Sequence, residues 1–226
     1  MSVDNIQFLA YPLQQIPFVI ITLMIAFTLH EFAHAYTAYK FGDPTAKNQG
    51  RLTLSPLAHL DPFGTLLILI AGFGWARPVP VNRYFFKKPR LAGVIVSAAG
   101  PLSNLAIAFV GTAIWFILLS TGMMNNIPVN VGDALKQFFN ILISLNIMLF
   151  LFNLLPFPPL DGYRIIEDLV PNSVRAKMSQ YEHYGVILFL IIAITPLNRH
   201  TIQPFFEFGS NLIFAVFQFI LQPLIW

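Results

Sequence analysis

Two histidines and a glutamate stand close together in the stretch His30-Glu31-Phe32-Ala33-His34, an H-E-x-x-H pattern. In a helix, side chains four residues apart share one face at a spacing of about 6 Å, so both imidazoles can bind one metal ion. Glu31 is rotated by about 100° from His30, where its carboxylate can act as general base toward water activated by the metal. We expect one Zn²⁺ per chain, although His and carboxylate sets also accept other divalent ions.

A catalytic zinc site needs three protein ligands and one open position. The chain has no cysteine, so the third ligand must be a histidine or a carboxylate. Asp161 is the strongest candidate because it follows an apolar helix that is expected to end near Leu155. The prolines of the stretch 153–162 and the glycine at its end break that helix and can direct the carboxylate into the bundle.

The residues before the H-E-x-x-H pattern, IPFVIITLMIAFTL, are almost entirely apolar. His30, Glu31 and His34 are therefore expected at membrane depth. Ionisable groups are costly there and mark functional sites by default. This context removes the alternative interpretation, in which the three residues form a solvated polar face of a soluble helix.

The composition places the whole chain in a membrane. Hydrophobic residues make up 56% of the 226 positions and charged residues only 10%, against about 25% charged in soluble domains. We predict a single all-α domain over residues 1–226, a polytopic bundle of about five to six transmembrane helices with a small β-like or re-entrant element near the active site. The net charge of +3 is spread over loops, without the long basic run that a nucleic-acid partner would need.

Spans of about 20 apolar residues identify the helices that must position the site. Four segments qualify, namely Ile16–Tyr39, Leu91–Leu119, Ala134–Leu155 and Phe206–Trp226. Two shorter apolar segments of roughly 13 residues, Gly64–Ala76 and Gly185–Leu197, could be short spans or re-entrant pieces.

Gly50–Gly64 and Arg77–Phe86 alternate β-branched and polar residues between prolines and glycines, which favours short strands or extended segments at the rim of a cavity. If Gly64–Ala76 is re-entrant, the thirteen Lys and Arg residues divide eleven to two across the membrane, whereas a full crossing divides them eight to five. The positive-inside rule favours the first division, with the active-site end facing the cytoplasm.

Three motifs in their order resemble the site-2 protease family of intramembrane zinc metalloproteases: HEFAHAY (residues 30–36), AAGPLSN (98–104) and NLLPFPPLDG (153–162). The resemblance runs from Ile16 to about Arg164, and it fits the minimal form without PDZ or nucleotide-sensing modules. It implies cleavage of transmembrane segments of membrane protein substrates, as in regulated intramembrane proteolysis. The implied zinc ligands are His30, His34 and Asp161, with Glu31 as base.

The resemblance also implies that Asn104 and Asn153 hold the substrate backbone or stabilise the oxyanion. From the residues alone, each asparagine could instead hydrogen-bond a neighbouring helix. His59 and Asp61 could orient the metal ligands through hydrogen bonds, or serve only as turn and cap residues in PLAHLDP. Gly100 is expected to allow close helix approach and Pro101 a kink.

Two other functions use the same residues. A metal-ion transporter would need ionisable groups at several depths along a path, whereas here they cluster at one level. A membrane zinc protease acting on soluble or lipidated peptides would take Glu167 or Glu207 as third ligand in place of Asp161. The expected partners are the lipid bilayer and a transmembrane protein or peptide substrate, in a bacterial or archaeal plasma membrane. The sequence does not fix the oligomeric state.

Overall fold

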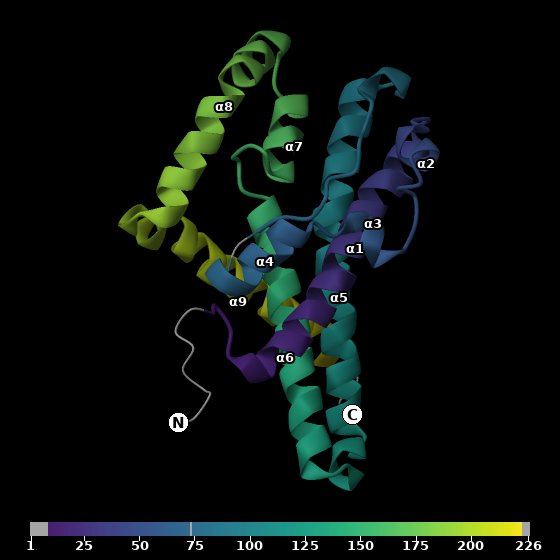
Figure 1. The fold of residues 1–226 in the computed structure, drawn as a ribbon, viewed down its shortest axis with the longest axis vertical. Coiled ribbons are helices and arrows are strands. Elements are labelled where there is room, and N and C mark those ends of the chain that lie inside the picture. The colour runs from purple at the N-terminus through teal and green to yellow at the C-terminus, as the bar shows by residue number, and fades with distance from the viewer. Residues whose placement is uncertain (1–8, 73, 223–226) are drawn as a thin grey trace.

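The computed structural model describes residues 9–72 and 74–222, and every regular element in these ranges is a helix (Figure 1). The α-helices are α1 (Ile16–Lys40), α2 (Thr45–Asn48), α3 (Pro56–His59), α4 (Pro62–Ala71), α5 (Pro89–Ser120), α6 (Val129–Asn153), α7 (Asp161–Leu169), α8 (Asn172–Ile194) and α9 (Ile202–Leu221). Short 3-10 turns lie at Leu13–Gln15, Arg83–Phe85, Met123–Asn126 and Pro196–His200.

Four of these helices are long and apolar enough to cross a membrane: α1 with the turn before it, α5, α6 and α9. They correspond to the four predicted spans, although residues 223–226 of the last predicted span lie outside the described residues. The predicted total of five to six spans is not confirmed. Helix α8 has 23 residues, but its first half carries charged and polar side chains and only its second half is apolar.

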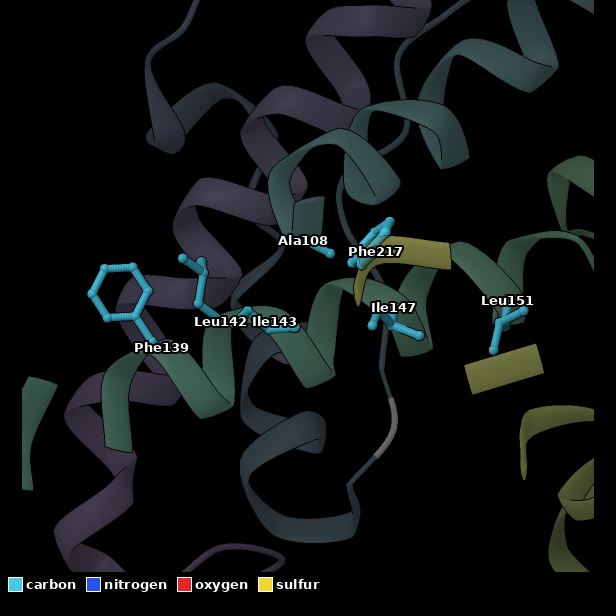
Figure 2. Close-up of a cluster of buried hydrophobic side chains, with 7 residues drawn as sticks. All are labelled: Ala108, Phe139, Leu142, Ile143, Ile147, Leu151 and Phe217. Atoms are coloured by element: carbon cyan, nitrogen blue, oxygen red, sulfur yellow. The ribbon is translucent and has the colours of Figure 1, made fainter. Parts of the chain in front are cut away.

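The core of the bundle lies where α5, α6 and α9 meet. Figure 2 shows its central cluster, which consists of Ala108, Phe139, Leu142, Ile143, Ile147, Leu151 and Phe217. Small residues on α5 let α6 approach closely, as is usual between membrane helices. A second cluster around Val19, Leu23 and Phe27 joins α1 to α6 and to α4 through Ile68.

The chain enters the predicted re-entrant segment from one end of the bundle and comes back to that same end. Helix α4 has 10 residues, so it is about 15 Å long, half the thickness of a hydrocarbon core of about 30 Å. Beyond it the chain comes back until the Asn82 N–H donates to the Asp43 carboxylate at 2.6 Å, beside the end of α1. These contacts support the re-entrant prediction for Gly64–Ala76, in which Phe73 lies outside the described residues.

Of the predicted short strands or extended segments, the strands do not form in the part of the chain that the structure describes. Pro56 and Pro62 occupy the first positions of α3 and α4, where their fixed φ favours a helix start. Residues 77–82 form no regular element, and Pro78 and Pro80 lack the N–H groups that a strand ladder needs. This part of the chain therefore packs against the helices without pairing.

Two glycines bring the arms of this hairpin into backbone contact. A Cβ atom on Gly64 would lie 2.1 Å from the Trp75 carbonyl oxygen, and one on Gly74 would lie 2.0 Å from the Gly64 carbonyl oxygen. Only glycine permits this separation. The hairpin consequently holds its returning arm, residues 74–82, against α4.

Candidate metal centre

Three ligand atoms converge between α1 and α7. The Nε2 atoms of His30 and His34 are 3.0 Å apart, and Asp161 Oδ2 lies 3.2 Å and 3.3 Å from them. In a tetrahedron with metal–ligand bonds of about 2.0–2.1 Å, two ligand atoms are about 3.3–3.4 Å apart. The three side chains therefore fit a zinc ion bound by two imidazoles and one carboxylate, with a fourth position open.

Helix α5 leaves room for the metal by placing a glycine opposite the ligands. A Cβ atom on Gly100 would lie 2.3 Å from His34 Nε2 and 2.6 Å from His30 Nε2. A side chain here would thus occupy the space that an ion bound by both imidazoles needs. The expected close approach of a helix at Gly100 is confirmed.

The orientation of His30 is fixed by a chain of amides that starts at a backbone carbonyl. Asn146 donates from Nδ2 to the Leu142 carbonyl at 2.8 Å, so its Oδ1 faces Asn104 and accepts from Asn104 Nδ2 at 3.0 Å. Asn104 Oδ1 then faces His30 Nδ1 at 2.7 Å. Because an oxygen faces Nδ1, the proton sits there and Nε2 keeps its lone pair for a metal.

His34 is oriented in the same way by the backbone of α5. Its Nδ1 lies 2.7 Å from the Val96 carbonyl oxygen, which can only accept. Both imidazoles therefore present Nε2 to the metal position. The last turn before Gly100 supplies one of these acceptors, and the turn after it supplies the other.

Glu31 is buried beside the ligands and is held by the returning arm of the hairpin. Its Oε2 accepts a hydrogen bond of 2.7 Å from the Val79 N–H. The flanking Pro78 and Pro80 fix the backbone on both sides of this donor. One carboxylate oxygen is thus fixed in place by the protein, while the other is not used in this contact.

The break between α6 and α7 aims Asp161 at the histidines. Gly162 packs so closely on the last turn of α6 that a Cβ atom would lie 2.3 Å from the Leu154 carbonyl oxygen. Asp161 is the first residue of α7. Burial raises its pKa, but the two imidazoles outweigh burial and hold the pKa of this carboxyl well below its usual range.

The metal centre opens into a cavity of about 720 Å³. One part of its wall is apolar and comes from α1, α4 and α6, with Leu23, Ile68 and Leu145 among its members. Another part is charged and includes Arg83 and Glu167. The site is therefore reached through a space whose wall changes from apolar to charged.

Of the other predicted site residues, Asn153 lies on the cavity wall and donates from Nδ2 to the Leu149 carbonyl of its own helix. Its role toward substrate stays a prediction. Asn104 is fully buried, and its amide group contacts His30, Asn146 and the Ala26 carbonyl. These contacts favour the interpretation of Asn104 as a link between helices that also positions His30, and they leave its amide no spare donor for an oxyanion.

In the part of the chain that the structure describes, the side chains of His59 and Asp61 make local hydrogen bonds, and the His59 carbonyl accepts from the Arg77 N–H of the returning arm. His59 Nε2 lies 2.8 Å from the Thr53 carbonyl, and Asp61 caps α4 by accepting from the Gly64 N–H. Both contacts match the turn and cap interpretation. Neither of the alternative third ligands joins the centre, because Glu167 lies among arginines and Glu207 is exposed on α9.

Sequence reasoning missed Asn146, Val96 and Val79. Asn146 carried a signal, because an asparagine within the apolar run ISLNIMLF needs a partner inside the bundle. The other two contribute backbone groups, whose use no side chain reveals.

Comparison with known proteins places this centre in a family. The model of "Peptidase family M50" matches residues 129–195, which contain Asn153 and Asp161 but neither His30 nor His34. A protein of Bacillus subtilis (strain 168) is 60% identical over 219 residues, which cover 97% of this chain and 99% of the relative. The chain belongs to peptidase family M50.

A second relative, from Mycolicibacterium smegmatis, is 30% identical over 200 residues, or 83% of this chain and 72% of the relative. Both relatives carry the name "Putative zinc metalloprotease", YwhC in the first species and Rip2 in the second. No solved structure gives a significant match. The resemblance to the site-2 protease family is thus confirmed, and the chain is a zinc-dependent metalloprotease of the membrane.

Proposed function

We propose that this M50 protease cleaves transmembrane segments of membrane protein substrates, with Glu31 as general base. The observation that supports it best is the position of the centre. His30, Glu31 and His34 lie on α1, a candidate span, and the cavity that they line is walled by the apolar helices α1, α4 and α6. A substrate helix in the bilayer would meet this wall, and its peptide bond must unwind locally to reach the ligands.

The residues of the chain divide the chemistry among them. When bound, zinc supplies Lewis acidity that polarises a carbonyl and lets water lose a proton near neutral pH. Glu31 takes that proton and later returns it to the leaving amine, while the Val79 N–H keeps the carboxylate in place. Asn153, on the cavity wall, is the remaining candidate for holding the substrate backbone.

The returning arm has little capacity to pair with a substrate as an added strand. Between Arg77 and Asn82, two residues are prolines, and three N–H groups are already bonded to His59, Glu31 and Asp43. Only the Val81 N–H is left in this stretch. The arm is better suited to hold Glu31 than to bind substrate along its length.

The test is to purify wild type, Glu31→Gln and Glu207→Gln in detergent, measure bound zinc, and assay cleavage of single-span membrane peptides and of soluble peptides. We expect near-stoichiometric zinc in all three. Cleavage of membrane peptides should fall by about 10²- to 10⁴-fold in Glu31→Gln alone. Cleavage of soluble peptides only would overturn the substrate class, and zinc loss in Glu207→Gln would restore the alternative ligand.

We further propose that the active-site end faces the cytoplasm of a bacterial plasma membrane. The charge division of eleven to two supports this orientation. Because the chain has no cysteine, single cysteines at Lys47 and Lys136 can be labelled from outside intact cells. We expect labelling at position 136 only, and labelling at position 47 alone would reverse the orientation.

A further inference from the structure

Two segments that are not neighbours in the chain complete the metal centre beside α1, which carries His30, Glu31 and His34. Helix α7 supplies Asp161, and the returning arm supplies the Val79 N–H that holds Glu31. Arg83 follows this arm directly and reaches α7. Its Nη1 lies 2.5 Å from Asp168 Oδ1, and its Nη2 lies 3.9 Å from Glu167 Oε2.

The carboxylate that receives Arg83 is deeply buried. The side chain of Asp168 is 0% exposed. It packs against Gly93 of α5 so closely that a Cβ atom on this glycine would lie 2.0 Å from Asp168 Oδ2. Burial raises the pKa of Asp168 even though Arg83 and Arg175 oppose it. A buried carboxylate is strongly destabilising when its cation is removed, so this end of α7 depends on its arginines.

The residue before Arg83 is anchored to a second buried carboxylate. The Asn82 N–H donates to Asp43, which is fully buried at the end of α1 and also accepts from the Thr45 N–H. The last residue of the arm and the residue after it are thus attached to two different parts of the centre. Asn82 is bonded beside the end of α1, which carries Glu31, and Arg83 is paired with α7, which carries Asp161.

We propose that Arg83 is a positioning residue that couples the base to the third metal ligand. Its ion pair with Asp168 holds the arm so that the Val79 N–H stays on Glu31, and it holds α7 so that Asp161 stays beside the histidines. Arg83 itself touches no reacting atom. The inference rests on the proposed role of Glu31, but its test needs no substrate.

Hydrogen exchange gives a direct readout, because Pro78 and Pro80 leave only four exchangeable amides between residues 77 and 82. Three of them are bonded, and the Val79 amide is the one bonded to Glu31. In the zinc-loaded full chain, we expect Arg83→Gln and Asp168→Asn each to raise Val79 exchange at least tenfold. Both should also lose zinc to a chelator at least tenfold faster, since Asp161 is held less firmly.

The matched control is Arg175→Gln, which removes a cation 3.5 Å from the same Asp168 oxygen but lies on α8 and does not reach the arm. Its Val79 exchange should stay within twofold of wild type. Arg83→Lys, which keeps the charge, should restore most of the protection. Circular dichroism and size-exclusion profiles confirm that each variant is folded.

Where a cleavable membrane peptide is found, Arg83→Gln should lower kcat at least tenfold and change KM less than threefold. If wild type cleaves no such peptide, the proposed function fails while exchange and zinc loss still test the pair. The inference itself is overturned if, in folded Arg83→Gln, either Val79 exchange or zinc loss stays within twofold of wild type. It is also overturned if Arg175→Gln raises Val79 exchange as much as Arg83→Gln does.

Discussion

Two of the glycines on helix α5, Gly100 and Gly111, differ in what lies opposite them. Gly100 faces the imidazoles of the metal centre, where a Cβ atom would be 2.3 Å from His34 Nε2. Gly111, three turns later, faces the apolar core of Figure 2, where a Cβ atom would be 3.3 Å from the Ile143 and Leu142 side chains.

The difference is between fixed and adjustable neighbours. The imidazoles at Gly100 are held through Nδ1 by Asn104 and Val96, so they cannot retreat from an added atom. The ends of Leu142 and Ile143 can change rotamer by a small amount. Substitution at the metal end of α5, around Gly100, should therefore abolish zinc binding. Substitution at the apolar end, around Gly111, should instead lower stability through poorer packing.

The sharpest test of this contrast is an added methyl group at each glycine. Gly100→Ala should abolish zinc binding and reduce proteolysis by more than about 10³-fold, because the methyl group fills the metal position. Gly111→Ala, the matched control on the same helix, should keep stoichiometric zinc and cost at most about 1–3 kcal/mol of stability by overpacking. Zinc analysis of purified protein measures both, and retention of zinc in Gly100→Ala would break the comparison.

At the apolar end, Ile147→Ala should lower the free energy of unfolding by about 2–5 kcal/mol, because it leaves a cavity beside α9. Zinc affinity of the folded protein should be unchanged. Reversible unfolding in mixed micelles measures the first quantity and zinc titration the second. Ile147→Val, which removes one methyl group, should cost about 0.5–1.5 kcal/mol.

At the metal end, Asn104→Ala should weaken zinc binding by about 10- to 100-fold, as expected when the group that orients a histidine ligand is removed. Competition with a chromogenic chelator measures the change. Asn140→Ala on the exposed face of α6 is the matched amide deletion and should leave zinc affinity unaltered. Equal effects of the two substitutions would show that the amide chain does not serve His30.

The smallest effect is expected in the hairpin that contains α4. Asp61→Ala removes the cap of α4 and should cost about 0.5–2 kcal/mol, with zinc affinity unchanged because the Asp61 carboxylate accepts from the Gly64 N–H and not from a metal ligand. Asp61→Asn keeps an acceptor and should recover most of the loss. A large fall in zinc affinity in Asp61→Ala would instead restore the prediction that this residue orients the ligands.

The metal ligands could be predicted because helical spacing and membrane depth constrain them locally. His30 and His34 share one face wherever the helix goes, and Asp161 follows a helix break that prolines enforce. Whether the predicted strands or extended segments would pair could not be decided, since alternation at Arg77–Phe86 indicates extended backbone but does not provide a partner. Similarly, no local pattern reveals that Arg83 lies beside Asp168, 85 residues away in the chain.

The sequence by itself determined the solvent, the four long spans and the three side chains that could hold a metal ion, because hydropathy, helix periodicity and ligand chemistry are properties of short segments. The tertiary structure alone decided which groups orient those ligands. Asn146, the Val96 carbonyl, the Val79 N–H and the Arg83–Asp168 pair act through contacts between separate helices and the hairpin arm. Their roles depend on distances of about 3 Å that only packing brings about.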